Sequence, residues 1–266
     1  MTPSTEGASG RARLLALITN DDGIDSEGLR QLALAARAAR LDVLVAAPIE
    51  EASGTGGSLT AVQTDGRVVV EERRLEGLDG IGCYAVAAAP AFIVRIACRG
   101  AFGRLPDVVL SGINRGANTG NAILHSGTVG AALTGHLEGR PSMAVSLAGS
   151  AAVHWGTAAH VTAGILPRLL AGDEPLVLNL NVPDVPAAEL RGLRLARLAS
   201  YGAVQTTVTE VGQGFVRVGW GNGSARLEPD SDAMLLSSGH ATLTVLESVT
   251  ERSGVELPEL TVPRAS

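Results

Sequence analysis

Two adjacent carboxylates offer the clearest chemistry in this chain: Asp21 and Asp22 follow an apolar run at 14–18 and precede Gly23. An uninterrupted apolar run is typical of a strand that is buried on both faces of a sheet. Such a strand would place two hard oxygen donors side by side at the sheet edge, where they favour a divalent cation. The alternative is that one aspartate caps a helix that begins near Ser26, because aspartate is a favoured N-cap residue.

A second oxygen-rich segment makes a metal site the stronger interpretation. The sequence SGINRGAN at 111–118 also follows an apolar strand, at 108–110. Because the carboxyl ends of parallel strands meet at one edge of a sheet, we expect three loops to bring together four oxygen donors: Asp21, Asp22, Ser53 and Asn114. An all-oxygen set prefers Mg²⁺, Mn²⁺ or Ca²⁺ to softer metals. Ser53 taken alone is better explained by turn chemistry, since Ser-Gly pairs are common in turns.

A third segment, HSGTVGAA at 125–132, places small hydroxyl residues and glycine at the start of a predicted helix. The exposed N–H groups and the positive end of a helix form a binding site for anions. Taken alone, the segment is explained by ordinary N-capping through Ser126 or Thr128. Beside a metal site, phosphate is the natural anion, and backbone N–H groups and Asn118 would hold its oxygens.

Together these segments predict metal-assisted hydrolysis of a phosphate ester. The cation would polarise a phosphoryl oxygen and lower the pKa of a bound water, so that no protein nucleophile is needed. One of the two carboxylates, Asp21 or Asp22, would bind the metal and also accept the proton of the water. The sequence does not show which of them does so.

Composition excludes several other classes of protein. The 266 residues are 45% hydrophobic, which supports a sizeable core, and the net charge of −6 comes without a basic block, so polymeric nucleic acid is not an expected partner. The sequence contains no lysine, which excludes a P-loop and Schiff-base chemistry. The two cysteines, Cys83 and Cys98, lack metal-type spacing, so zinc-thiolate chemistry is excluded and a reducing compartment is favoured.

The ends and the apolar segments predict a cytoplasmic protein. Residues 1–10 are rich in Thr, Ser, Gly and Pro and have no apolar core of a signal peptide, so they predict a disordered tail, as do residues 251–266. The most apolar late stretch, 155–170, contains Pro167 and suits a buried helix rather than a membrane span.

The elements that must position this chemistry alternate between strand and helix from 14 to 147, which predicts a largely parallel sheet with helices on both faces. The expected strands are 14–18, 42–47, 68–70, 83–86, 107–110 and 143–147, and the expected helices are 26–40, 90–99 and 128–138. Polar loops after several of these strands mark the ligand-binding edge.

The pattern changes after the strand-like segment 176–183, where helical periodicity disappears. Residues 206–210 and 215–220 predict a hairpin, and 241–246 alternates as a final strand. We therefore divide the chain into a Rossmann-like α/β core at 11–183 and a β-rich extension at 184–250 that would serve oligomer contacts and closure of the site.

The motifs resemble, in the same order, those of the SurE survival-protein family of phosphatases. The similarity covers about 14–183 and continues more weakly to about 246, and its matching motifs are TNDDGI at 19–24, SG at 53–54, SGINRGAN at 111–118, SGTVGAA at 126–132 and NLNVP at 179–183. The resemblance implies a Rossmann-like α/β core with a C-terminal β-hairpin extension used in dimer or tetramer assembly. It also implies divalent-metal-dependent phosphatase activity on nucleoside monophosphates.

Residue roles follow from the resemblance by position. It implies metal binding by Asp21, Asp22, Ser53 and Asn114, and phosphate contacts from Asn118, Ser126, Gly127 and Thr128. The same loops were selected above from their chemistry alone.

Some positions depart from the family pattern. Where the family usually has GTPAD, this chain has AAPAF at 88–92, so the substrate preference stays open. His125 stands where tyrosine is common, and His240 occupies another position that is often aromatic. Either histidine is a candidate accessory group that protonates a leaving alkoxide, although a hydrogen-bonded structural role is the simpler interpretation. Base stacking has three candidates, for each of which core packing is the simpler role: Tyr84, Phe92 and Trp220.

Two classes of function remain. The first is a phosphatase that acts on nucleoside 5'-monophosphates or, in view of 88–92, on another phosphorylated metabolite. The second is a non-catalytic phosphate- or nucleotide-binding protein on the same fold, since a fold does not fix a function. The retention of two mutually repelling carboxylates favours the first. A Rossmann dehydrogenase is disfavoured, because no Gly-x-Gly-x-x-Gly follows the first strand.

Overall fold

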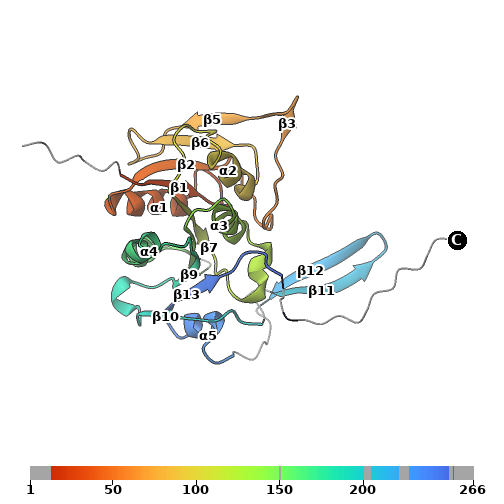
Figure 1. Ribbon diagram of the computed structural model, residues 1–266. Coiled ribbons are helices and arrows are strands. Elements are labelled where there is room, and N and C mark those ends of the chain that lie inside the picture. The colour runs from red at the N-terminus through yellow and green to blue at the C-terminus, as the bar shows by residue number, and fades with distance from the viewer. Residues whose placement is uncertain (1–12, 150, 201–204, 222–227, 252–253, 255–266) are drawn as a thin grey trace, which may run out of the picture.

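The computed structural model describes residues 13–149, 151–200, 205–221, 228–251 and 254. Within these residues, nine strands form one central sheet in the order β10-β13-β9-β8-β7-β1-β2-β6-β5 (Figure 1). The six inner strands from β6 to β9 run parallel, whereas β5 and β13 pair antiparallel to their inner neighbours. The prediction of a mostly parallel α/β sheet is therefore confirmed.

The parallel strands are short, and the innermost of them are apolar and buried. Their bounds are β1 (Leu15–Thr19), β2 (Asp42–Pro48), β6 (Gly82–Val86), β7 (Val108–Arg115), β8 (Ser142–Ala148) and β9 (Val177–Pro183). All five residues of β1 and all seven of β9 are buried. Strands covered on both faces are expected in a parallel sheet with helices on each side.

Helices cover both faces of the sheet. Their bounds are α1 (Glu27–Ala38), α2 (Pro90–Ala97), α3 (Gly127–Leu137) and α4 (Trp155–Leu170). Helix α1 packs against α4 on one face, and α2 packs against α3 on the other. Leu29 and Leu32 of α1 are fully buried in the larger core cluster, as the spacing of apolar residues in 26–40 predicts.

The order of the strands creates a topological switch point between β1 and β7. From β1 the chain crosses to β2 and then β6 on one side, while β7, β8 and β9 follow on the other side. Crossovers leave β1 and β7 in opposite directions, which opens a crevice at their carboxyl ends, where open α/β sheets bind ligands. Asp21 follows β1 and Asn114 lies near the end of β7, so the predicted metal ligands flank this crevice.

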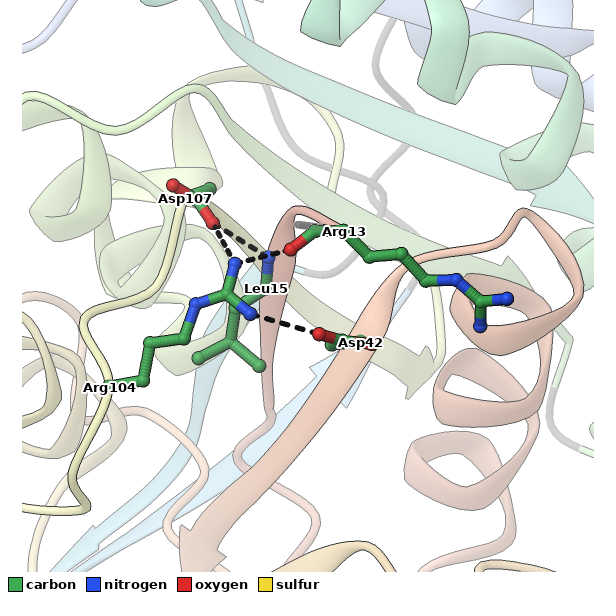
Figure 2. A network of polar contacts seen from close by, with 5 residues as sticks. All are labelled: Arg13, Leu15, Asp42, Arg104 and Asp107. Atoms are coloured by element: carbon green, nitrogen blue, oxygen red, sulfur yellow. Dashed lines mark hydrogen bonds and ion pairs between the residues drawn. The ribbon is translucent and has the colours of Figure 1, made fainter. Parts of the chain in front are cut away.

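The opposite edge of the sheet is fixed by a polar network around Arg104 (Figure 2). Its guanidinium donates to the carboxylates of Asp42 and Asp107, at 2.9 and 3.0 Å, and to the carbonyl oxygen of Arg13. Asp107 in turn accepts the backbone N–H of Leu15 at 2.7 Å. The network joins the starts of β1 and β2 to the segment before β7, and so it aligns the strands that carry the site at their other ends.

Strand β7 is longer than predicted. The sequence predicts a strand that stops at Leu110 and a loop at 111–118, but the strand continues to Arg115. It does so through a register shift against β8 between Ser111 and Asn114. Gly112 permits the shift, because its φ is 133° and a Cβ there would lie 2.2 Å from the carbonyl oxygen of Val145.

The C-terminal part does not stand apart from the sheet. Strands β10 (Leu193–Leu195) and β13 (Ala241–Leu246) extend the central sheet beyond β9, so the predicted boundary at 183 falls within one continuous sheet. A helix that the sequence analysis missed, α5 (Asp232–Ser237), lies between them in sequence. Its six residues are too few to give a helical period, although Ser231 caps it by accepting from the N–H of Met234.

Three shorter features complete the fold. The predicted hairpin is confirmed as β11 (Gln205–Gly212) and β12 (Phe215–Gly221), and it projects from the body of the molecule (Figure 1). At the other end, β5 (Val70–Arg73) borders the sheet, and β3 (Gln63–Thr64) pairs with β4 (Arg67–Val68).

The tail predicted at 1–10, and all of 251–266 except 251 and 254, lie outside the described residues. None of the helices in the described segments is long and apolar enough to cross a membrane.

Candidate functional site

The two carboxylates lie in a loop that is fixed by hydrogen bonds of its own. Asn20 donates from its side-chain amide to the carbonyl of Gly23 at 3.1 Å and to the hydroxyl of Ser26 at 2.6 Å. The cap of α1 is Ser26, whose hydroxyl accepts the N–H of Leu29. Helix capping therefore does not explain Asp21 and Asp22.

Asp21 is held from three directions. Its side chain is buried, with 4% of the residue exposed, and its Oδ1 accepts a short hydrogen bond from the hydroxyl of Thr128. Its carbonyl oxygen accepts the N–H of Ala52, at 2.7 Å, from the loop after β2. Gly127 packs directly against it, because a Cβ there would lie 2.8 Å from Oδ2 of Asp21. The position of this carboxylate is thus determined by β1, β2 and α3 together.

Burial disfavours the charged form of both carboxylates. Burial raises the pKa of Asp21, against the lowering effect of hydrogen bonds from Thr128 and Gly127. Burial and then repulsion by Asp21 raise the pKa of Asp22 to about 6. Arg115 offsets part of this charge, since its backbone N–H donates to Oδ2 of Asp22 at 3.3 Å. A cation bound between the two carboxylates would remove the repulsion.

The two uncharged candidate ligands, Asn114 and Ser53, lie at the same edge of the sheet as the two aspartates. The amide nitrogen of Asn114 donates to the carbonyl of Gly116 at 2.8 Å, which leaves the amide oxygen as the group that a cation can use. Ser53 lies on the exposed loop after β2, where its hydroxyl donates to Oε1 of Glu51 at 2.7 Å and keeps its lone pairs. Both residues line the same cleft as Asp21 and Asp22.

This cleft has a volume of about 700 Å³. Seven of the residues that the sequence analysis selected line it, namely Asp21, Asp22, Ser53, Asn114, Asn118, His125 and Ser126. Gly127 and Thr128 are buried beneath Asp21, and His240 precedes β13, outside the cleft lining. The four predicted metal ligands are thus brought together, and the predicted phosphate ligands are divided between the cleft and its floor.

Asn118 is anchored by the strands next to the cleft. Its carbonyl accepts from the amides of Asn179 and Asn181, at 2.9 and 2.8 Å, and its N–H donates to Oδ1 of Asn181 at 2.8 Å. One side-chain N–H of Asn118 donates to the hydroxyl of Ser146 at 2.9 Å. The asparagines of the NLNVP motif therefore fix the loop that follows β7, and both are fully buried within β9.

The start of α3 faces Asp21. Ser126 caps the helix by accepting the N–H of Val129 at 3.1 Å, as the capping alternative predicts. Hydrogen bonds from the backbone N–H groups of Gly127 and Thr128 lower the pKa of Asp21. These two groups, which the sequence analysis assigned to phosphate, therefore stabilise the buried carboxylate in this structure.

The two candidate accessory histidines differ in position. His125 is exposed at the mouth of the cleft, and its carbonyl accepts the N–H of Gly56 at 3.2 Å. His240 follows α5, where its N–H donates to the carbonyl of Leu235, and its buried Nδ1 has no partner among the described residues. Of the two, His125 is the one that lines the cleft.

The donor set suits a hard divalent cation. Two carboxylates, one amide oxygen and one hydroxyl line a single cleft, and oxygen ligands of this kind hold Mg²⁺, Mn²⁺ or Ca²⁺. Among the described residues, no three His, Cys, Asp or Glu side chains gather as a metal site. The candidate set instead combines two carboxylates with the neutral oxygens of Asn114 and Ser53. Burial raises the pKa of both aspartates, and a bound cation would favour their charged forms.

Sequence reasoning missed three residues near the site. Among the described residues, Arg115 is the only arginine that lines the cleft, and Glu51 lines it beside Ser53. Trp155, the first residue of α4, lines an adjoining pocket that also contains Asp22. Arg115 lies within the SGINRGAN motif and could have been selected as a phosphate partner, whereas no local signal links Trp155 to Asp22.

Comparisons with known proteins agree on one family. The model of the family described as "Survival protein SurE" matches residues 16–204. The chain is 35% identical over 239 residues to the 5'-nucleotidase SurE of Desulfitobacterium hafniense (strain DSM 10664 / DCB-2), covering 87% of this chain and 90% of that protein. It is 36% identical over 241 residues to the 5'/3'-nucleotidase SurE of Proteus mirabilis (strain HI4320), covering 88% and 89%. The crystal structure of the SurE protein from Aquifex aeolicus matches with a TM-score of 0.73 at 30% identity, covering 87% and 92%.

Proposed function

Because this chain belongs to the SurE family of survival proteins, we propose that it is a phosphatase that hydrolyses nucleoside 5'-monophosphates with the help of a divalent cation. The observation that carries the proposal is the convergence of Asp21, Asp22, Ser53 and Asn114 on one cleft at the switch point of the sheet. The names of relatives at 35–36% identity support the substrate class.

The four oxygen donors would hold the cation, with Mg²⁺ or Mn²⁺ as the first candidates. The bound ion supplies polarisation of a phosphoryl oxygen and activation of water. Every other contribution comes from the chain. Thr128 and Gly127 keep Asp21 in place from below, and Arg115 brings a positive charge to the cleft where phosphate oxygens would lie.

Proton transfer falls to groups that face the cleft. Asp22 is half-buried and lines the cleft, so its carboxylate is our candidate acceptor of the proton from water. Asp21 is less suited to this role, because Thr128 already donates to one of its oxygens. His125 at the mouth is placed to protonate the departing alkoxide.

A phosphate-release assay over a panel of esters tests this proposal. The panel contains the common nucleoside 5'-monophosphates, sugar phosphates and glycerol phosphate, each assayed with Mn²⁺ or Mg²⁺ and again with EDTA. We expect release from nucleotides that requires the metal and falls at least about 100-fold in Asp22→Asn. Asp173→Asn is the matched control, because Asp173 is exposed in the loop between α4 and β9, at the opposite edge of the sheet.

Other outcomes would replace the proposal. Release from sugar phosphates but from no nucleotide would move the substrate to another phosphorylated metabolite, as the AAPAF segment at 88–92 allows. Tight nucleotide binding without release from any ester would make the chain a binding protein.

We also propose that the chain assembles as a dimer or tetramer through the hairpin β11/β12. Val208, Val211, Phe215 and Val216 of this hairpin are exposed, with 50–75% of each residue accessible. Exposed apolar side chains on a projecting element favour contact with another chain. Light scattering of the full chain would give the mass of more than one subunit, and Phe215→Ser with Val211→Ser would lower it.

A further inference from the structure

A second pocket opens directly beside the cleft. It has a volume of about 550 Å³ and lies between the loop after β1, the loop after β2, the start of α1 and the first residue of α4. It shares Asp22, Glu51 and Arg115 with the cleft, so the two cavities adjoin at these residues. We call it the Trp155 pocket. Its volume is in the range of pockets that bind small molecules.

The apolar walls of the Trp155 pocket are Ile24, Ile49 and Trp155. Backbone hydrogen bonds fix two of them, since the N–H of Ile24 donates to Pro48 at 2.9 Å and the N–H of Ile49 donates to Val86 at 3.0 Å. Both loops are thus tied to the sheet. The pocket is therefore preformed rather than dependent on a ligand to order it.

Trp155 packs closely against α1 at Gly28, which has no side chain to obstruct it. A Cβ on Gly28 would lie 2.9 Å from Cζ3 of Trp155 and 1.9 Å from the carbonyl oxygen of Ile113, so only glycine allows this close approach. Trp155 is half-buried, and its side chain contacts the main core cluster. Trp155 thus both packs against the core and lines the pocket.

The rim of the Trp155 pocket is acidic. Asp25 and Glu50 are exposed and form no ion pair with any described residue, whereas Glu27 is occupied by Arg30 at 2.7 Å. Arg115 is the only cationic residue that the described part of the chain contributes to the lining. Carboxylates accept hydrogen bonds from hydroxyl and amino groups and repel anions. The rim therefore disfavours an anionic group in this pocket and favours a ligand that carries hydrogen-bond donors.

We propose that the Trp155 pocket binds the nucleoside part of the substrate, with its base stacked on the indole of Trp155 and its ribose hydroxyls near Asp25 and Glu50. This inference rests on the proposed phosphatase function, because it assumes that the phosphoryl group of the same substrate lies in the cleft. The phosphoryl group lies in the cleft, and the ester continues past Asp22 and Arg115, which belong to both cavities. A ligand with a second phosphate in the pocket is rejected by the acidic rim.

Tryptophan fluorescence tests this proposal without any turnover. The chain has two tryptophans, and Trp220 lies in β12, so Trp220→Phe leaves Trp155 as the sole emitter. We expect adenosine, which carries no phosphate, to quench this emission in a saturable manner after correction for absorbance. Glu50→Gln combined with Asp25→Asn weakens the quenching, and adenosine carrying a 3'-phosphate quenches less than adenosine.

Kinetics provide the second readout. We expect Trp155→Leu to raise the KM for nucleoside 5'-monophosphates about tenfold more than the KM for glycerol phosphate, because a base–aromatic stack is lost. Trp155→Phe restores most of the difference. His160→Ala, on an exposed part of the same helix, is the control that leaves both values unchanged. Melting temperatures verify that each variant is folded.

The outcomes separate this inference from the function on which it rests. A protein that releases phosphate from esters but shows no saturable quenching, and whose KM ratio is unaffected by Trp155→Leu, overturns the nucleoside pocket and leaves the phosphatase intact. A protein that releases no phosphate from any ester but is quenched by adenosine keeps the pocket and overturns the proposed reaction.

Discussion

Gly127 and Asp21 are packed so closely that any side chain at position 127 would displace its neighbours. A Cβ there would lie 2.8 Å from both the Cβ and the Oδ2 atom of Asp21, and 2.9 Å from the hydroxyl of Thr55. The helix that follows therefore begins directly beneath the buried carboxylate. The glycine of the SGTVGAA motif is required by the position of the proposed metal ligand, and not by the flexibility of a loop.

Gly127→Ala should accordingly damage activity far more than folding. The added methyl group must displace Asp21 by a fraction of an ångström to about one ångström, and a shift of that size costs about 100-fold in rate. The measurement is kcat/KM for phosphate release with Mn²⁺. Gly156→Ala, in α4, is the matched control, because a Cβ there has no atom within 4 Å, and its activity should equal that of the unmodified chain. Equal activities of both variants would contradict this reading of the packing.

Thr128→Val removes the hydroxyl that donates to Oδ1 of Asp21 while keeping the shape of the side chain. One hydrogen bond to a charged acceptor contributes about 1.5–3 kcal/mol, so we expect about a tenfold or larger loss of cation affinity. Thr128→Ser retains the donor and should keep most of the affinity. Calorimetric titration with Mn²⁺ compares the two. A valine variant that binds as tightly as the serine variant would show that the hydrogen bond is dispensable.

Asp107→Ala should lower stability without affecting catalysis. The Asp107 carboxylate accepts from Leu15 at 2.7 Å and from Arg104 at 3.0 Å, at the edge of the sheet opposite the cleft (Figure 2). Loss of these bonds should reduce the free energy of unfolding by about 1–3 kcal/mol. Urea denaturation measures this loss. The exposed pair of Arg73 and Glu71 gives the contrast, because Arg73→Ala should change stability by less than about 0.5 kcal/mol.

Asp184 makes stability depend on pH in the acid range. Burial acts to raise the pKa of Asp184, but N–H groups of His154 and Val153 outweigh it and lower the pKa below its ordinary 3.8. A lowered pKa means that the carboxylate stabilises the fold above about pH 4, and that this contribution disappears as the pH falls through the folded-state pKa. We expect Asp184→Asn to cost about 1 kcal/mol at pH 7 and progressively less below pH 4. A difference between the two proteins that stays constant from pH 7 to pH 3 would refute the linkage.

The fold was largely predictable because its signals are local. Apolar runs such as β1 and the 16-residue helix α4 carry their periodicity in the sequence, and the alternation of strand and helix predicts a parallel sheet. Helix α5 was missed because six residues give no period. The placement of β10 and β13 in the main sheet was missed because strand pairing between distant segments leaves no trace in either segment alone.

Sequence patterns could identify only those oxygen donors of the cleft that lie near the end of a predicted strand. Asp21 and Asp22 could be selected because they follow the buried strand β1, and Asn114 because it follows the apolar run at 108–110, although it lies within β7. The engagement of α3 with Asp21, and the adjacency of Trp155 to Asp22, depend on tertiary packing of segments more than 100 residues apart. Spacing along the chain carries no information about such contacts.

Titration of the metal-free chain with Mn²⁺ tests the central claim most directly, when binding and phosphate release from a nucleoside 5'-monophosphate are measured on the same samples. We predict that the unmodified chain and Asp173→Asn bind one ion per chain and gain activity in proportion to occupancy, and that Asp22→Asn binds at least about tenfold more weakly and stays inactive. Phosphate release that persists in EDTA, or binding by Asp22→Asn that equals that of the unmodified chain, would contradict the claim that these carboxylates hold the catalytic cation.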